Sequence, residues 1–478
     1  MSGYRDENER MLATALGLAP EEAAQRLKQA VAIVAAEDST SQALAYELHA
    51  QLARTVHVAP SHGAADLEVA IGRSGTGRAA RTLFVDVDEN GLRVSSLAPA
   101  TRGNLLADKF RLTFAGCYAA APVLRHLLQM GSLGYTPTRN PFVVKFASLG
   151  IPDDIFDLPL VFADTALAGA GAIGNGFLRA LRHLPVEGVL PIVDPKLLGA
   201  GNANRCLYFA EDEPVGPKAE LLAMRAQPDF SSLRLEPHVQ TFSDYVRVKG
   251  RVRRVIVATD SRRVRRAIQS DLPLEVVDAS TTDIREIVVH SHRQPTHNAC
   301  LACIYRHIRE EQTREREIAR GLGIDFEDVA QGLISVKVAR KIVESHPDLD
   351  AKRIEGMAFD SLFRQRCAEQ QLLTATGIQV LSPFAFVSNL AGALLALELT
   401  RLARDGDDPM RPNYMFLSPW SPPNARARLT RPRHFECSFC ARPQNLMALR
   451  TVWADHLRDQ RPAPPLHHDI SITHQSTF

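Results

Sequence analysis

The sequence lacks the segments that place a protein in or across a membrane. Its 478 residues contain no run of about 18 apolar residues, the length that a membrane-spanning helix needs. The amino terminus, MSGYRDENER, is charged where a secretion signal would carry its apolar segment. We therefore expect a cytoplasmic protein that has no membrane partner.

The sequence also lacks an excess of charge of either sign. It has 56 lysines and arginines against 54 aspartates and glutamates, so its formal charge is only +2. This is too little to indicate a surface that follows nucleic-acid phosphates, and the basic run at Arg251, Arg253 and Arg254 is typical of a solvated face. We expect no nucleic-acid partner.

Cysteine is scarce, and its number is odd. Seven cysteines in a chain without a secretion signal argue against a disulfide framework and favour metal binding or a reactive thiol. Four of them form two CxxC pairs, Cys300 with Cys303 in NACLACIY and Cys437 with Cys440 in ECSFC. Two such pairs match tetrahedral zinc. Because four protein ligands leave no open coordination position, we expect the zinc to be structural.

The length and the hydrophobic content of 45% are those of a soluble protein with two or three domains. Up to about residue 150, ENERMLATAL and PEEAAQRLKQAVAIVAA are helical in pattern, and LEVAIG is a strand. LFVDVDENGLRVSS predicts a hairpin that turns at Glu89, Asn90 and Gly91. An alanine-rich helix, AGCYAAAPVLRHLLQM, follows.

From Leu158 to Asp278, apolar strands alternate with helices, which predicts an α/β domain with a mainly parallel sheet. The segment from Tyr305 to Cys367 is charged and has a helical pattern, and we interpret it as an insertion. GIQVLSPFAFVSNLAGALLALELTRLAR then predicts a strand and a long small-residue helix, and YMFLSPW and ARARLT predict further strands. From about residue 461 the chain reads as a flexible tail.

A glycine motif stands where the α/β pattern begins. Gly169, Gly171 and Gly174 have GxGxxG spacing between a strand and a helix, so backbone amides can approach phosphate oxygens there. Asp194 follows Gly174 by 20 residues and closes the next strand, where a carboxylate can accept bonds from ribose hydroxyls. A tight turn without a ligand has the same spacing. The motif also does not separate a dehydrogenase from an adenylating enzyme.

The next block makes that separation. GNANRCLYFAEDEPVGPKAE resembles the ThiF, MoeB and ubiquitin-activating enzyme superfamily in its asparagines, its arginine, a short acidic connector, and a glycine and lysine that open a helix. The matching residues are Asn202, Asn204, Arg205, Gly216 and Lys218. An arginine and a lysine beside a glycine-rich loop can neutralise a triphosphate as pyrophosphate leaves. By itself, Lys218 would be a solvated lysine at a helix start.

Asp260, in RRVIVATDSRRVRRAI, ends a strand at the edge where open α/β sheets hold their ligands. In the superfamily that this sequence resembles, the matching aspartate helps to hold magnesium. The other interpretation is a helix N-cap. The resemblance also implies that the paired-cysteine zinc site lies away from the nucleotide.

Three cysteines remain outside the CxxC pairs. Cys117 lies in a helix predicted to be buried, and Cys206 follows the phosphate-binding arginine. Cys367 ends the helical insertion, where ubiquitin-activating enzymes place their thioester-forming cysteine, and Arg364 and Arg366 would favour its thiolate. The family's proline before this cysteine and threonine after it are absent, so a plain helix cysteine is the alternative.

The resemblance covers about residues 158 to 440. It implies a Rossmann-like adenylation domain with a parallel-rich sheet, an N-terminal pseudo-adenylation half, a helical cysteine-domain insertion and a four-cysteine zinc site. The predicted domains are an inactive pseudo-adenylation domain (1–150), the first part of the active adenylation domain (151–299), a helical insertion with the candidate cysteine (300–374), the return of the adenylation domain with zinc closure (375–460) and the tail (461–478).

The activity that the resemblance implies is ATP-dependent activation of a ubiquitin-like protein that ends in glycine. ATP and magnesium would bind at Gly169 to Gly174, Asp194, Asn202, Arg205, Lys218 and Asp260. The carrier's carboxylate would form an acyl-adenylate, Cys367 would capture the acyl group as a thioester, and a ubiquitin-conjugating-like enzyme would receive it. Activating enzymes of bacterial ubiquitin-like antiviral operons are similar.

Two other functions stay open, as does a homodimeric state. A sulfur-carrier adenylyltransferase like ThiF or MoeB would form the adenylate without a thioester. A scaffold that binds nucleotide without catalysis is the second, but the intact Arg205, Lys218 and Asp260 argue against it. Arg5 and Arg10 are candidates for an arginine that the N-terminal half lends to ATP, and a solvated position is the alternative for each.

Overall fold

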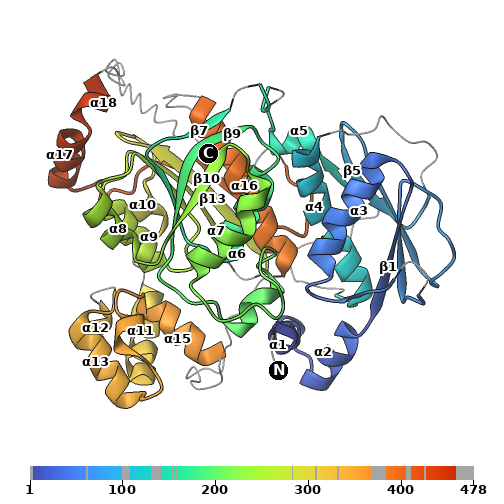
Figure 1. Cartoon of the computed structure of the whole chain (residues 1–478), viewed down its shortest axis with the longest axis horizontal. Coiled ribbons are helices and arrows are strands. Elements are labelled where there is room, and N and C mark those ends of the chain that lie inside the picture. The colour runs from blue at the N-terminus through green and yellow to red at the C-terminus, as the bar shows by residue number, and fades with distance from the viewer. Residues whose placement is uncertain are drawn as a thin grey trace, which may run out of the picture.

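The computed structural model describes residues 4–60, 63–98, 108–130, 141–152, 154–157, 159–282, 284–306, 309–330, 333–368, 384–404, 411–424 and 427–458. These residues form two sheets that lie side by side, with helices packed between them (Figure 1). We refer to residues 4–152 as the N-terminal half and to residues 159–458 as the C-terminal half.

The N-terminal half is built on one sheet. Its elements are α1 (Tyr4–Leu16), α2 (Pro20–Leu27), β1 (Ala30–Ala35), α3 (Ser39–Leu52), β2 (His57–Val58), β3 (Leu67–Ile71), β4 (Thr82–Val87), β5 (Gly91–Ser95), α4 (Lys109–Leu127), β6 (Phe142–Lys145) and α5 (Phe146–Leu149). The strand order is β2-β1-β3-β4-β5-β6. The first four strands are parallel, and β5 and β6 are antiparallel to their neighbours.

The helix predicted over PEEAAQRLKQAVAIVAA is wrong in its second part. The helix α2 ends at Leu27, and residues 30–35 form β1. This segment, AVAIVA, pairs in parallel with β2 on one side and β3 on the other, so its backbone bonds and its β-branched side chains are satisfied in the sheet. Pairing across the fold therefore overrides the local helical pattern. The predicted hairpin is confirmed as β4 and β5.

The C-terminal half has a larger sheet. Its elements are β7 (Leu160–Phe162), β8 (Thr165–Ala168), α6 (Ala172–Leu181), β9 (Val186–Val193), η1 (Ala200–Asn204), α7 (Lys218–Ala226), η2 (Gln227–Asp229), β10 (Leu233–His238), α8 (Phe242–Lys249), β11 (Arg254–Val257), α9 (Arg262–Ser270), β12 (Glu275–Thr282), β13 (Glu286–Arg293), α16 (Ala385–Arg404), β14 (Tyr414–Leu417) and β15 (Arg428–Leu429). The strand order is β10-β9-β8-β11-β12-β13-β14-β15, and β7 also pairs with β9.

The first five strands in that order are parallel, which confirms the α/β class with a parallel-rich sheet. The antiparallel strand β13 was not predicted, whereas β14 and the short β15 correspond to the predicted YMFLSPW and ARARLT strands. The strand predicted at GIQVLSP and the predicted tail lie outside the described residues.

The two sheets share one connection order. In each, a central strand (β1 or β8) leads through a helix (α3 or α6) to a strand on one side of it. The chain then crosses to the other side, directly in the N-terminal half and after one further strand, β10, in the C-terminal half. In each, a long alanine-rich helix comes late in the half, α4 before β6 and α16 before β14. The alanine-rich helices noted in the sequence therefore occupy equivalent places in the two halves.

These helices form the seam between the halves. α16 packs on α6 and also on α4, which packs on α3. The backbones of α6 and α16 approach so closely that a Cβ on Gly176 would lie 2.7 Å from the Cα of Asn389. α16 is long and apolar enough to cross a membrane, but its residues from Ala385 to Leu402 are buried here, so it is a core helix.

A helical insertion and a C-terminal helix pair complete the described chain. These elements are α10 (Leu301–Ile304), α11 (Arg309–Leu322), α12 (Phe326–Ala330), α13 (Val336–Ser345), α14 (Ala351–Ile354), α15 (Phe359–Ala368), α17 (Pro443–Val452) and α18 (Ala454–Arg458). Helices α11 to α15 enclose a small core of their own, which includes Leu322, Phe359 and Phe363. They lie together at one side of the C-terminal half (Figure 1).

Candidate nucleotide site and metal centre

The glycine motif forms the turn from β8 into α6. Gly169 has a φ of +111°, and a Cβ there would lie 2.7 Å from the backbone carbonyl carbon of Ala258. No other residue type fits this backbone without strain. Gly171 is the N-cap of α6, with no side-chain cap and with open space within 4 Å of where its Cβ would be. The first amides of α6 are thus positioned for an anion at a helix N-terminus.

Asp194 holds this turn in place. Its two carboxylate oxygens accept hydrogen bonds from the backbone amides of Ala170 and Lys196, each at 2.8 Å. The residue is buried at the end of β9. Each carboxylate oxygen can accept one more hydrogen bond, which leaves room for a ribose hydroxyl. The predicted contact of Asp194 with a ribose stays a prediction.

Asp260 lies after β11, at the same edge of the sheet. Its carboxylate accepts two bonds from the Lys196 ammonium, at 2.7 and 2.9 Å, and a third from the hydroxyl of Ser361 at 3.0 Å. Ser361 belongs to α15, so the helical insertion contacts this site directly. The N-cap of α9 is Ser261 and not Asp260, so the N-cap interpretation of Asp260 is wrong.

A second hydrogen bond joins the same two segments. The Ser261 hydroxyl donates to Asp360 at 2.8 Å, while Ser361 donates to Asp260. Two Asp-Ser pairs, one after β11 and one at the start of α15, thus exchange hydrogen bonds. This contact fixes the start of the cysteine-bearing helix at the candidate site.

Lys218 opens α7 beside these groups. Its backbone amide donates to the carbonyl of Lys196 at 2.9 Å. Burial lowers the pKa of its ammonium, and the nearby carboxylates of Asp194 and Asp260 oppose that shift. Within the described residues, no hydrogen bond or ion pair to its Nζ is found. Lys218 is therefore a cation held near the glycine turn without a fixed partner.

The η1 segment brings the predicted asparagines and arginine to this edge. Arg205 donates to the side-chain oxygen of Asn204 at 2.6 Å. The side-chain oxygen of Asn202 is buried and has no partner among the described residues. Burial raises the pKa of the Cys206 thiol, against the charges of Arg205 and Lys218. Cys206 is thus a buried neutral thiol, and the cations of Arg205 and Lys218 lie near it.

The two CxxC pairs come together as predicted. The Sγ atoms of Cys300, Cys303, Cys437 and Cys440 lie within 4.8 Å of one another, and all four residues are buried. The separations are 3.7 Å for Cys300 to Cys303, 3.6 Å for Cys300 to Cys437 and 3.3 Å for Cys303 to Cys440. Tetrahedral zinc with bonds of about 2.3 Å separates its sulfur ligands by about 3.8 Å.

This cysteine cluster joins α10 to the segment before α17. The backbone amides of His434 and Phe439 point at the Sγ atoms of Cys303 and Cys437, at 3.4 and 3.5 Å. Such amides stabilise thiolates. The donor set, its burial and its spacing therefore fit a metal ion such as zinc.

Comparison with known families accounts for this combination of sites. Residues 1–152 match the E1 N-terminal domain, and residues 159–439, more than half of the chain, match the ThiF family. The chain belongs to the ThiF family. This is the family that the glycine turn and the block around Arg205 had indicated.

One curated relative of this ThiF-family chain is the uncharacterized protein y4jF of Sinorhizobium fredii. The two are 27% identical over 341 residues, which are 67% of this chain and 64% of that protein, so the match spans less than two thirds of the relative's length. Among solved structures, E. coli MccB with ATP is 14% identical over 68% of this chain and 75% of that one, with a TM-score of 0.35. E. coli MccB with MccA-N7isoASN is 15% identical over 68% and 74%, with a TM-score of 0.36.

Cys367 lies in the last turn of α15, and its side chain and that of Arg364 lie outside the described residues. Arg366 is buried and forms an ion pair with Asp348. Its charge is therefore already balanced, which weakens the predicted effect of Arg366 on a thiolate at Cys367. Cys117 is buried in α4, as predicted, and burial raises the pKa of its thiol.

Arg5 and Arg10 are the two arginines that the N-terminal half was predicted to offer to ATP. Arg10 forms an ion pair with Glu7 at 2.9 Å on α1. The side chain of Arg5 lies outside the described residues. The predicted contribution of an arginine to the ATP site stays a prediction for both.

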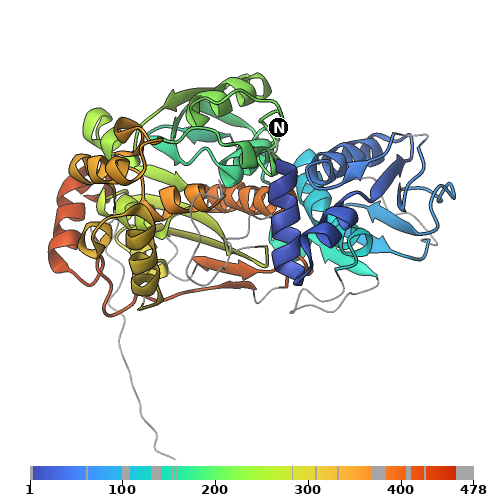
Figure 2. The same cartoon turned by 90° about the horizontal axis from the view of Figure 1, so that it is seen from below.

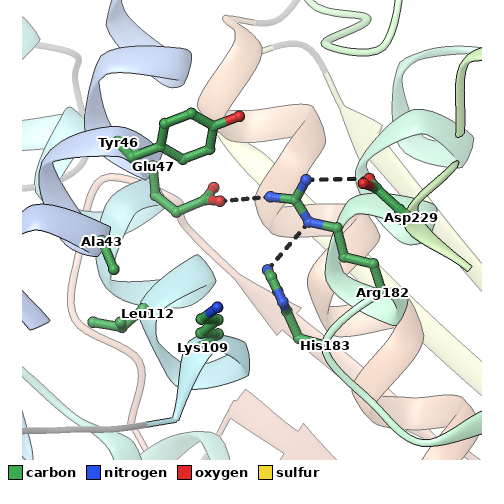
Figure 3. A pocket seen from close by; sticks show the side chains of 8 residues that line it. All are labelled: Ala43, Tyr46, Glu47, Lys109, Leu112, Arg182, His183 and Asp229. Atoms are coloured by element: carbon green, nitrogen blue, oxygen red, sulfur yellow. Dashed lines mark hydrogen bonds and ion pairs between the residues drawn. The ribbon is translucent and has the colours of Figure 1, made fainter. Parts of the chain in front are cut away.

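A cavity of about 370 Å³ lies elsewhere on the seam (Figure 3). Arg182 crosses it between Glu47 and Asp229, at 2.8 and 3.2 Å, and burial with the charge of Arg182 lowers the pKa of His183 to about 4. Arg182 and His183 directly follow α6, whereas the glycine turn is at its beginning. The length of α6, about 15 Å, therefore separates this cavity from the candidate nucleotide site.

Three polar residues at the site were missed in the sequence. Lys196 stands two residues after Asp194. It follows the same strand end, so the position that indicated Asp194 could also have indicated Lys196. Ser361 and Asn8 are distant in sequence from every motif, and only the packing of α15 and α1 brings them to the site. No local pattern could have indicated either of them.

Proposed function

We propose that this chain adenylates the C-terminal carboxylate of a ubiquitin-like protein with ATP and then captures the acyl group on Cys367. A ubiquitin-conjugating-like enzyme would take the acyl group from that thioester. The proposal refines the adenylyltransferase type that the ThiF family supplies.

One observation carries the adenylation step. At a single edge of the C-terminal sheet, the start of α6, the ammonium of Lys218 and the carboxylate of Asp260 converge, and among the described residues the ammonium has no hydrogen-bond or ion-pair partner. The first two suit phosphate oxygens, and a carboxylate suits a magnesium ion that accompanies ATP. Asp260 would have to exchange its bonds with Lys196 or Ser361 to serve a metal.

The N-terminal half supports a single active site. Its equivalent turn, from β1 into α3, has Glu37 and Asp38 in place of the glycines, and Asp38 caps α3 by accepting a bond from the Ser41 amide at 2.8 Å. A carboxylate at that helix start occupies the position of an anion and repels phosphate. This fits an inactive partner half.

In the proposed first step, the carrier's carboxylate oxygen attacks the α-phosphorus of ATP. The new O–P bond forms as the bond to the β-phosphate breaks, giving an acyl-adenylate and pyrophosphate. The amides of α6, Arg205 and Lys218 would neutralise the departing charge, and this requires positioned charges rather than a protein nucleophile.

In the proposed second step, the Cys367 thiolate attacks the acyl carbon and AMP leaves, after the thiol proton has gone to solvent. Cys367 is six residues beyond Ser361, a rise of about 9 Å along a helix, and Ser361 contacts Asp260. A helix that begins at the nucleotide edge thus carries the cysteine. Zinc in the cysteine cluster would take no part in the chemistry and would tie α10 to the C-terminal segment.

The adenylation step is tested by ATP–pyrophosphate exchange with ubiquitin-like proteins that end in glycine. We expect exchange with a cognate carrier, none with a carrier lacking its last glycine, and near-complete loss in Lys218→Ala and Asp260→Ala. Lys249→Ala, at an exposed lysine on α8, is the matched control. Full exchange in both site variants would refute this assignment of the phosphate and magnesium site, and absence of exchange with every carrier would favour the scaffold.

The thioester step is tested with Cys367→Ala. The variant should keep pyrophosphate exchange and lose the reductant-sensitive adduct that the wild-type chain forms with the carrier on a non-reducing gel. If the wild type makes adenylate but no adduct, the chain is a sulfur-carrier adenylyltransferase instead. If Cys367→Ala keeps the adduct, another cysteine is the acceptor.

A further inference from the structure

The phosphate-binding arginine of the proposed site is held from the other half of the molecule. Helix α1 packs on α2 of the N-terminal half and also lies against η1 of the C-terminal half, the segment that ends just before Arg205. Figure 2 shows α1, in dark blue, at the seam between the halves. The residues of α1 that face η1 are therefore in a position to control Arg205.

A buried chain of hydrogen bonds runs from α1 to Arg205. The Asn8 side-chain nitrogen donates to the carbonyl of Arg54 at 2.7 Å, and the Asn204 side-chain nitrogen donates to the Asn8 side-chain oxygen at 3.1 Å. The Asn204 oxygen then accepts from Arg205 at 2.6 Å. Asn8 and Asn204 are only 2% and 1% exposed, so water does not compete for these bonds.

The groups at the two ends of this series of hydrogen bonds, Arg54 and Arg205, determine the order of donors and acceptors within it. The Arg54 carbonyl can only accept and the Arg205 guanidinium can only donate. Both asparagine amides must therefore turn the same way, each with its nitrogen toward Arg54 and its oxygen toward Arg205. An apolar residue at position 8 would leave Asn204 with a buried donor that has lost its acceptor.

A second contact from the N-terminal half holds the same segment. The guanidinium of Arg54 donates to the carbonyls of Ala203 and Phe209, at 3.0 and 2.8 Å. These carbonyls lie on either side of Arg205 in the sequence. The backbone that carries Arg205 is thus clamped while its side chain is oriented.

We propose that Asn8 is a positioning residue that orients Arg205 toward the β- and γ-phosphates of ATP. The proposal rests on the proposed function for the role of Arg205 and adds to it a neutral residue of the opposite half. The N-terminal half would then serve the nucleotide site through the Asn8–Asn204 relay, whether or not it also lends an arginine.

The test compares the affinities of the full chain for Mg·ATP and for AMP, measured by calorimetry. AMP lacks the phosphates that Arg205 would contact. We expect Asn8→Ala to weaken ATP binding roughly tenfold and to leave AMP binding within about twofold. Thr14→Ala, at an exposed position of the same helix, should change neither affinity.

A double-mutant cycle separates positioning from general destabilisation. Arg205→Ala should remove the preference for ATP over AMP, and adding Asn8→Ala to it should change that preference no further. If Asn8→Ala does not fold, Asn8→Ser replaces it in the cycle. The shorter side chain cannot bridge the Arg54 carbonyl and the Asn204 amide as Asn8 does, so it should lower the preference for ATP in the same way.

Two outcomes would overturn the relay. One is an equal loss of ATP and AMP affinity in Asn8→Ala, and the other is an additive effect of Asn8→Ala in the Arg205→Ala background. A wild-type chain that binds neither nucleotide would instead contradict the proposed function, so the two failures are distinguishable.

Discussion

At the scale of single residues, two charged groups of the candidate site differ in their surroundings. Asp260 is satisfied by Lys196 and Ser361, whereas the ammonium of Lys218 has no described partner and is partly desolvated. A desolvated cation is more weakly stabilised in its charged form, and it gains more from a phosphate than an exposed lysine does. This difference makes Lys218 a sensitive probe of the site.

The lowered pKa of Lys218 predicts how ATP affinity depends on pH. Below this pKa the ammonium is charged and attracts phosphate, and as the pH rises through it the attraction is lost. Because burial lowers the pKa, ATP affinity should begin to fall at a pH below the value of about 10.4 at which a free lysine titrates. Calorimetric titrations between pH 7 and the alkaline limit of stability would measure the fall.

Lys218→Arg serves as the control for that pH profile, since an arginine stays charged in proteins. It should flatten the alkaline fall even if its affinity at neutral pH is lower. An identical alkaline fall in this variant would assign the titration to another group.

At the scale of elements, the cysteine cluster is what ties the start of the insertion to the C-terminal helices. α10 and the segment before α17 share a small core around the cysteines that includes Trp453 and Leu449. The indole of Trp453 also donates to the carbonyl of Leu272 at 2.7 Å. Without a metal, this small core would hold four buried thiols with no ion to join them.

We therefore expect one zinc per chain and its loss in Cys303→Ser. Structural zinc contributes roughly 10 to 16 kcal/mol of binding free energy, so the variant should also unfold at a lower temperature and lose solubility. Metal analysis and thermal unfolding of the purified proteins measure both effects. Ser438→Ala, an exposed change between the two cysteines of the second pair, should retain the metal. Wild-type protein without zinc would contradict the prediction.

At the scale of the whole molecule, a buried cluster of charge joins the two halves in addition to helix packing and the contacts of Asn8 and Arg54. Glu47 of α3 accepts from Arg179 at 2.9 Å and from Arg182 at 2.8 Å, across the seam. Glu47 and Arg179 are both buried. Removing the carboxylate would leave a buried guanidinium without its counter-charge.

Glu47→Ala should accordingly destabilise the chain by about 3 to 5 kcal/mol. Glu22→Ala removes a half-exposed ion pair with Arg26 on α2 and should cost less than about 1 kcal/mol. Urea unfolding of the two variants and the wild type makes the comparison. Equal and small changes would show that the buried pair contributes little to holding the halves together.

Much of the fold followed from local patterns, and the exceptions are instructive. Alternating apolar runs predicted the parallel sheet, and the CxxC spacing predicted the ligands of the cysteine cluster, because each run and each CxxC pair is a local pattern. The two pairs themselves meet across 137 residues. The strand at AVAIVA was predicted as helix because its stability comes from partners on β2 and β3, which the local pattern does not contain. β13 was missed altogether.

The sequence by itself determined the family, the α/β class and the residues with the right chemistry for a nucleotide site, since motifs are carried by short segments. Only the tertiary structure decided how these residues are held. The contacts of Ser361 with Asp260, and of Asn8 with Asn204, join residues 101 and 196 positions apart. Such contacts depend on where whole helices pack, and helix packing is a property of the complete core rather than of any one segment.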